Sequence, residues 1–173
     1  MRFCYFGTGM AVSIIITLVL PMMSACRKQP TAAELEKKKA EQFHTTLQQS
    51  LKFRLTAYYS DKPIDYIESD SVQLLETDLW KYVRDYVKDD YYLFTSAGDV
   101  EVIQNALKIP SDFSDTIRYN YNVNAEGDHT DFNFYDYEYN PLTYKLAEFS
   151  ADYFIVYVTR GDANIYSRYE KVP

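Results

Sequence analysis

Cysteine and histidine are scarce in this sequence, and their scarcity excludes several kinds of chemistry. The two cysteines are Cys4 and Cys26, so residues 27–173 carry no thiol. Disulfides, thiol nucleophiles and cysteine-ligated metals are therefore excluded from that part of the chain. The two histidines, His44 and His129, are far apart in the sequence. We therefore expect no transition-metal site.

Signatures of catalysis are also missing. No serine lies in a Gly-x-Ser-x-Gly elbow, which is the local pattern of many serine hydrolases. Glycosidic chemistry needs a pair of carboxylates, but with 25 acidic residues the sequence selects no pair. We assign no catalytic residue and no cofactor, and we expect a protein that is not an enzyme.

Basic residues are in the minority, with 18 Lys and Arg against 25 Asp and Glu and a net charge of −7. Nucleic acid is not expected as a partner, because phosphate binding requires clustered basic side chains. Glycine is limited to five residues, whereas tyrosine, with 18, is unusually abundant.

The sequence has no apolar run long enough to cross a membrane. Its most apolar stretch, residues 11–20, is shorter than the roughly 20 residues that a spanning helix needs. Arg2 precedes this stretch and the small residues Ser24 and Ala25 follow it. A basic start, a short apolar core and small residues before a cut site predict a secretory signal peptide.

The segment Met23-Ser24-Ala25-Cys26 resembles the lipobox of bacterial lipoproteins, with Met23 at the position of the usual leucine. The resemblance covers residues 1–26 and implies cleavage between Ala25 and Cys26, followed by acylation of Cys26. The alternative is an ordinary signal peptide cut near Ala25, which would leave Cys26 as a free thiol. Several acyl chains would hold the protein to a membrane essentially permanently, whereas one chain binds only marginally. Arg27 stands where an aspartate often retains such lipoproteins in the inner membrane, so we expect an outer-membrane protein facing the periplasm, or alternatively the cell surface.

The expected organisation is a signal peptide (1–25), a lipidated tether (26–30) and one domain (31–173), a typical length for a single domain. Thr31 and Glu34 have the spacing of a helix capping box. Apolar residues then recur every four positions, which predicts a helix over about 31–58. These residues are Phe43, Leu47, Leu51 and Leu55.

A second helix is expected over about 72–88 and a brief one over 100–108. Beyond residue 116 the apolar period changes to two, which predicts strands. These strands are expected at 116–124, at 131–139 with a bulge or a bend near Phe134 and Tyr135, at 153–159 in the middle of the sheet, and at 164–172 as its hairpin partner. Helices followed by an antiparallel sheet of about four strands predict an α+β domain, with the long helix packed across the sheet.

The stretch 122–131 imitates the start of a calcium-binding loop, with alternate oxygen-bearing side chains followed by Gly127. It departs from that pattern at both ends, because Asn122 replaces an aspartate and Asn133 cannot supply a bidentate carboxylate. A solvated hairpin loop is the alternative, and the sequence does not decide between the two.

The tyrosines are the remaining feature. If exposed, Tyr135, Tyr137 and Tyr139 on one strand would form a row of amphipathic rings, which suits contact with proteins or sugars. The alternative is that they simply cover a sheet face, because tyrosine favours strands. We expect a non-enzymatic adaptor or structural subunit of an envelope assembly, such as a secretion or transport machine. Its partners would be the membrane, through Cys26, and other envelope proteins. A glycan- or small-ligand-binding lipoprotein is the first alternative and a carboxylate-based hydrolase the second.

Overall fold

The computed structural model describes residues 29–49, 51–66, 74–107, 116–135 and 140–173. These residues form ten strands, two α-helices and one 3₁₀-helix. The helices are α1 (Ala32–Leu47), η1 (Trp80–Tyr82) and α2 (Asp85–Asp89). The strands are β1 (Lys52–Asp65), β2 (Leu75–Asp78), β3 (Tyr91–Phe94), β4 (Asp99–Ile103), β5 (Thr116–Asn120), β6 (Asn122–Glu126), β7 (His129–Tyr135), β8 (Pro141–Phe149), β9 (Tyr153–Arg160) and β10 (Ala163–Lys171).

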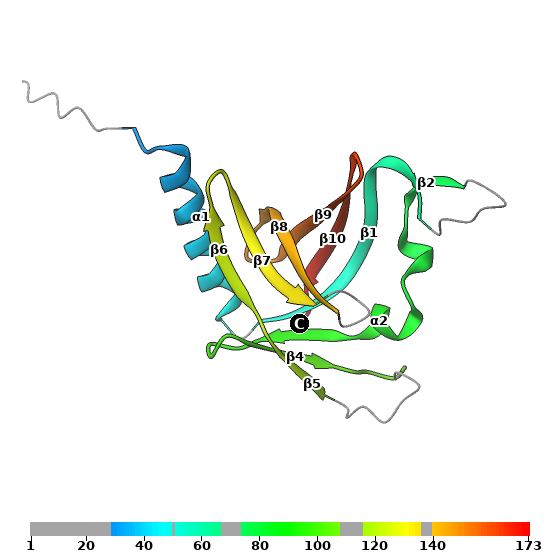
Figure 1. Ribbon diagram of the computed structural model, residues 1–173. Coiled ribbons are helices and arrows are strands. Elements are labelled where there is room, and N and C mark those ends of the chain that lie inside the picture. The colour runs from blue at the N-terminus through cyan, green and yellow to red at the C-terminus, as the bar shows by residue number, and fades with distance from the viewer. Residues whose placement is uncertain (1–28, 50, 67–73, 108–115, 136–139) are drawn as a thin grey trace, which may run out of the picture.

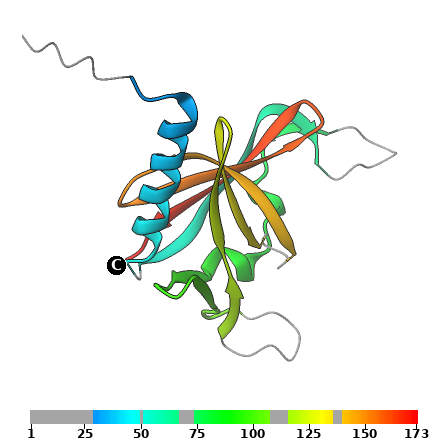
Figure 2. The ribbon, with the colours of Figure 1, turned by 60° about the vertical axis from the view of Figure 1, so that its left-hand side comes forward.

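All ten strands belong to one antiparallel sheet in the order β5-β4-β3-β1-β10-β9-β8-β7-β6, with β2 paired to β1 outside this path. The first and last strands of the path, β5 and β6, are consecutive in the chain and are separated only by Tyr121. Figure 2 shows them as one ribbon that passes from one end of the sheet to the other. The sheet therefore curls into a nearly closed, barrel-like shape, with β3, β4 and β5 below the other strands in Figure 1.

The predicted α+β class, with helices over 31–58 and 72–88 on a sheet of about four strands, is wrong. α1 ends at Leu47, and residues 52–65 form the long strand β1. Leu51 and Leu55 fit a four-residue period, but Phe53 between them is also fully buried, so the true period is two. The partner that makes this segment a strand is β10, more than a hundred residues away.

The second predicted helix is replaced by β2, η1 and the single turn of α2. Leu79, Val83 and Val87 are buried, but Leu75, four residues before Leu79, is 60% exposed, so a spacing of four marks the inward side only from Leu79 onward. The expected brief helix at 100–108 is also wrong, because Asp99–Ile103 is β4, with Val100 and Val102 buried in alternation.

Several local predictions are confirmed. Thr31 and Glu34 form the capping box: the Glu34 N–H donates to Thr31 Oγ1 (3.2 Å), and the Thr31 N–H donates to Glu34 Oε2 (2.7 Å). β9 lies between β10 and β8, and β9 and β10 form the predicted hairpin.

Two other expected strands differ in detail. The expected strand 116–124 is divided at Tyr121 into β5 and β6. Within the described residues, β7 and β8 pair in continuous register from Asp131 to Tyr135, so no bulge is found at Phe134, and residues 136–139 of the expected strand lie outside the described residues.

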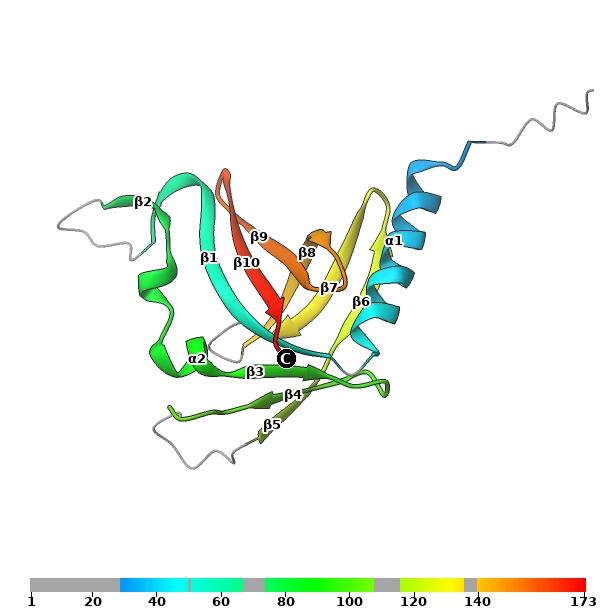
Figure 3. The same ribbon diagram turned by 180° about the vertical axis from the view of Figure 1, so that it is seen from behind.

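The interior of the sheet is filled by aromatic rings. The centroid of Phe154 lies within 6 Å of five other buried rings, which belong to Phe43, Phe53, Phe94, Phe132 and Tyr169. The centroid distances of 4.7–5.9 Å are those of favourable aromatic pairs. α1 contributes Ala40, Phe43 and Leu47 to this core and lies beside β6 and β7 (Figures 1 and 3). No described helix has both the length and the hydropathy needed to cross a membrane.

Tyr121 marks the point where the chain passes between the two ends of the sheet. Its N–H donates to the Gly98 carbonyl (3.0 Å) and its hydroxyl donates to the Thr95 carbonyl (3.3 Å). Burial, with a smaller contribution from Asp99, raises the pKa of Tyr121 to about 12. An unfolded tyrosine loses its proton near pH 10.

The folded state therefore holds the Tyr121 proton to a higher pH than the unfolded state does. The associated stability is fully present below about pH 10 and is lost as the pH rises towards about 12. Phenylalanine cannot ionise. Between about pH 10 and about pH 12, the free energy of unfolding of Tyr121→Phe should therefore fall by about 1–2 kcal/mol less than that of the wild type. Urea unfolding at several alkaline pH values measures the difference, and equal losses in the two proteins would contradict the prediction.

Candidate docking surface

The sequence-predicted site residues fall only partly within the described chain. Ala25, Cys26, Tyr137 and Tyr139 lie outside the described residues. Tyr135 is half-buried, and its ring stacks on that of Tyr119 with centroids 3.9 Å apart. This stack joins β7 to β5, so one face of the Tyr135 ring is covered by the protein itself.

The stretch 122–131 forms a β-hairpin. β6 and β7 pair from Asn122–Asn133 to Glu126–His129, and the two-residue turn Gly127-Asp128 joins them. Gly127 has φ of 61°, the left-handed conformation that such turns require and that glycine adopts readily. The oxygen-bearing side chains are thus spread along paired strands. No group of three or more possible metal-ligating side chains is found among the described residues.

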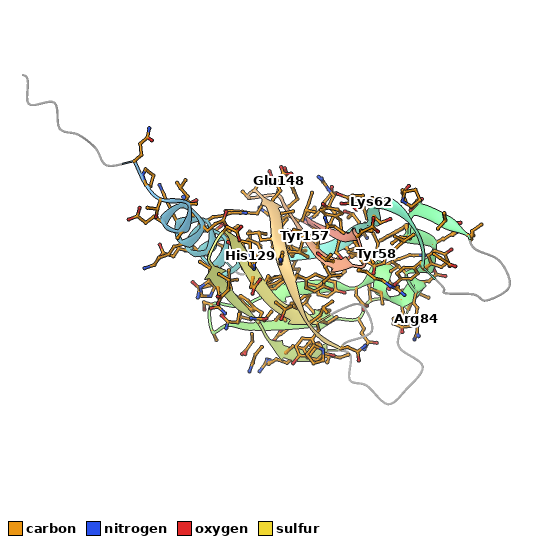
Figure 4. All side chains as sticks on the ribbon, turned by 45° about the horizontal axis from the view of Figure 1, so that its top comes forward. Tyr58, Lys62, Arg84, His129, Glu148 and Tyr157 are labelled. Carbon is orange, nitrogen blue, oxygen red and sulfur yellow. The ribbon has the colours of Figure 1, made fainter. Side chains whose placement is uncertain are left out.

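A row of tyrosines from three different strands crosses the outer face of the sheet. Tyr59 on β1 pairs with Tyr166 on β10, and Tyr166 pairs with Tyr157 on β9. The ring centroids of Tyr59 and Tyr166 are 5.2 Å apart with planes 12° from parallel, and those of Tyr157 and Tyr166 are 5.4 Å apart. We call these three residues the tyrosine row. Figure 4 labels Tyr157 and also Glu148 of the neighbouring strand β8, on which Lys145 is the residue paired with Tyr157.

The rings of the tyrosine row overlap one another. Two nearly parallel rings with centroids 5.2 Å apart must be offset and stacked, because coplanar rings at that distance would collide edge to edge. Stacking therefore covers part of one face of the Tyr59 ring and of the Tyr166 ring, whereas the Tyr157 ring is tilted by 36° to that of Tyr166. The ring edges and hydroxyl groups of such a surface suit hydrogen bonding and close packing by another protein.

Polar side chains along one border of the tyrosine row are hydrogen-bonded to one another. Asp61 accepts from both the backbone N–H (2.8 Å) and the side-chain amide (3.0 Å) of Asn164, and Thr159 Oγ1 donates to Asn164 Oδ1 (2.9 Å). Burial, followed by the nearby charge of Asp61, raises the pKa of Tyr166.

Charged side chains border the opposite side of the row. The Arg168 guanidinium lies over the Tyr153 ring at 4.4 Å, and its Nε donates to Glu170 Oε1 (2.8 Å). The Tyr153 hydroxyl donates to Glu148, and this hydrogen bond raises the pKa of Tyr153. These contacts pre-order several side chains, which lowers the entropy that a binding partner would have to remove.

The sequence did contain a signal for part of the row. A hairpin centred on Gly161-Asp162 pairs Tyr157 with Tyr166, because both lie equally far from the turn. Tyr59 carries no such signal, since the pairing of β1 with β10 is long-range.

Shallow grooves are the hollows found in the described structure. One, of about 380 Å³, lies beside the tyrosine row between Tyr59 and Trp80. Asp90 is the only fully buried acid among the described residues. The neighbouring Asp89 also has a buried carboxylate oxygen, but neither Asp89 nor Asp90 lines the groove beside the tyrosine row.

Comparison with known proteins found no matching family model, no similar curated protein and no similar solved structure.

Proposed function

We propose that this protein is a non-enzymatic bacterial lipoprotein that acts as an adaptor or structural subunit of an envelope assembly, such as a secretion or transport machine. Acyl chains on Cys26 hold it at the outer membrane, where it faces the periplasm. The signal peptide and lipobox resemblance of residues 1–26 support the location. The tyrosine row supports the docking role and is the observation on which the proposal depends most.

The proposed partner is a protein with a hydrogen-bonding surface of mixed charge. The chain is acidic, with a pI of about 4.8, and acidic side chains border the row: Asp61 on one side, and Glu148 and Glu170 on the other. Basic side chains border it as well, since Lys145 on β8 pairs with Tyr157 and Arg168 donates to Glu170. A complementary arrangement of charges on the partner would speed association. The glycan-binding alternative has less support, because stacking on Tyr59 covers one face of the central ring, Tyr166.

Tyr166→Ala should weaken partner binding by about 30-fold, which corresponds to about 2 kcal/mol at a tyrosine hot spot. Tyr166 is the central ring of the row, so its removal ends both stacking contacts. The measurement is affinity purification of the tagged, lipidated protein from gently crosslinked membranes, with quantitative mass spectrometry. The wild type should recover one or two envelope proteins in near-stoichiometric amounts, and the variant should not.

Tyr91→Ala is the matched control, because Tyr91 is a half-buried tyrosine on β3, away from the row. It should recover the same partners as the wild type. Equal recovery by Tyr166→Ala would contradict the docking role of the row. If the wild type is recovered alone, the adaptor proposal fails, and the response of tyrosine fluorescence to a panel of sugars becomes the next measurement.

A further inference from the structure

β6 is an edge strand that has a helix beside it. It ends the strand order of the sheet and pairs with β7 alone within the described part of the chain. α1 lies beside β6 and also contacts β7 (Figures 1 and 3). Between them is an open groove of about 400 Å³ whose lining includes Ala33, Ala40 and His44 of α1 and Val123, Ala125 and Gly127 of the hairpin. We call this the β6 groove.

The direction of the β6 backbone groups follows from the hairpin. Glu126 and His129 flank a two-residue turn, so they form a hydrogen-bonded pair. Because the pattern alternates, Asn124 and Asn122 also point their backbone groups towards β7. The N–H and C=O groups of Val123 and Ala125 therefore point away from β7, along the border of the β6 groove.

The strand itself lacks several of the features by which proteins block strand addition, although α1 lies beside it. β6 contains no lysine, arginine or proline, and its register with β7 runs without a bulge. Small residues line the groove on both sides, namely Ala33 and Ala40 of α1 and Ala125 of β6, and the charged side chains of Lys37 and Glu41 on α1 also line it. An exposed backbone edge beside a helix is an arrangement that can accept an extended peptide as an added strand.

The groove is held open by fixed contacts of α1 with the rest of the domain. Thr130 Oγ1 donates to Glu36 Oε2 (2.9 Å) and Lys39 Nζ donates to the Leu146 carbonyl (3.3 Å). The His44 ring packs edge-on against Tyr121, with centroids 5.9 Å apart. A peptide would meet a preformed site and would not have to separate the helix from the sheet.

We propose that the β6 groove binds an extended segment of a partner protein, which adds to β6 as an antiparallel strand. Small or β-branched apolar side chains of the segment would face α1. A basic residue at its N-terminal end would lie next to the hairpin turn, where Glu126 and Asp128 are exposed. Cross-strand pairs connect the two sites: Tyr157 of the tyrosine row pairs with Lys145 on β8, which pairs with Asp131 on β7, which pairs with Asn124 on β6. One partner can therefore reach both sites.

A second copy of this chain does not fit the same edge. Two β6 strands pairing directly would lie about 4.8 Å apart. Each β6 carries its own α1, and a helix with its side chains is about 10 Å across. The two helices would collide, whereas a peptide segment brings no helix. The inference rests on the proposed function only for the source of the segment, since a synthetic peptide tests the groove directly.

The first test is amide hydrogen exchange in the purified, lipidated protein in detergent micelles. The amides of Val123 and Ala125 should exchange at least about tenfold faster than those of Asn124 and Glu126. Protection of Val123 and Ala125 equal to that of Asn124 would mean that the edge is already paired, and would overturn the proposal.

The second test is binding of capped hexapeptides of alternating Val and Thr, carrying either Lys or Glu at the N-terminal end, followed by NMR. The Lys peptide should bind at or below about 1 mM, with shifts confined to β6 and α1, and several-fold more tightly than the Glu peptide. A version with proline at its centre should not bind, because proline cannot donate to the added ladder.

Ala125→Pro is the decisive variant. It removes the outward N–H and leaves the β6–β7 ladder intact, since proline is tolerated at such edge positions. It should weaken binding of the Lys peptide at least about tenfold. Ala125→Ser, which keeps the N–H, and Tyr166→Ala, which alters the tyrosine row, should leave this binding unchanged. Binding by no peptide, or binding that Ala125→Pro leaves unchanged, would overturn the proposal. A dimer that Ala125→Pro dissociates would overturn it in favour of self-pairing.

Discussion

Phe154→Ala should lower the free energy of unfolding by about 4 kcal/mol, in the range found when a buried phenylalanine is truncated. Phe154 is fully buried on β9. Its ring lies against five others from α1, β1, β3, β7 and β10. No single neighbour can fill the space that the ring leaves, because each is held on a different element. A cavity and lost contacts should both contribute to the loss.

Urea unfolding, followed by the fluorescence of Trp80 and by far-ultraviolet circular dichroism, measures this loss. Trp80 is the single tryptophan and packs against the core, so its emission reports tertiary structure. Tyr157→Ala is the control, because Tyr157 lies on the same strand but faces outward in the tyrosine row. It should cost about 1 kcal/mol or less. A loss below about 1.5 kcal/mol for Phe154→Ala would show that the ring is not central to the core.

The two variants also separate folding from docking. Phe154→Ala should reduce the amount of folded protein, because a loss of this size is a large part of a domain's stability. Tyr157→Ala should leave the amount of folded protein unchanged and reduce partner recovery. If Tyr157→Ala lowered stability as strongly as Phe154→Ala, the tyrosine row would be a structural feature.

Cys26→Ala should release the protein from the membrane almost completely. Each methylene of an inserted acyl chain contributes about 0.8 kcal/mol, so two or three chains hold a protein essentially permanently and their loss removes the anchor. The measurements are membrane fractionation and the intact mass of the protein. The wild type should carry added acyl mass on a chain that begins at Cys26, and the variant should carry none.

Cys4→Ala is the matched control, because Cys4 lies in the segment expected to be removed. It should leave both the acyl mass and the membrane fraction unchanged. A wild-type protein without acyl mass on Cys26 would disprove the lipoprotein assignment. So would a Cys26→Ala variant that stays with the membrane without acylation.

Local sequence signals predicted individual elements correctly. Thr31 and Glu34 marked the start of α1 because the capping box is a contact between residues three apart. The turn at Gly161-Asp162 between two apolar runs marked the hairpin of β9 and β10. Both features depend on neighbours in the chain, so the residues themselves carry the information.

The same local reasoning failed where distant partners decide the structure. Leu51 and Leu55 continue the helical spacing of Phe43 and Leu47, and nothing local opposes a longer helix. Pairing with β10 makes residues 52–65 a strand, since Phe53 and Leu55 then both face the core. A helical continuation would turn Phe53 away from the side that buries Leu55.

By itself, the sequence determined the start of α1, the β9–β10 hairpin and the absence of any thiol beyond residue 26. The tertiary structure alone decided that the sheet nearly closes at Tyr121, that the tyrosine row draws one ring from each of three strands, and that β6 is left as an edge beside α1. The physical reason is that strand pairing joins residues far apart in the chain. The hydrogen-bonding groups of one strand are the same whichever partner it finds, and only packing of the whole core selects among the possible pairings.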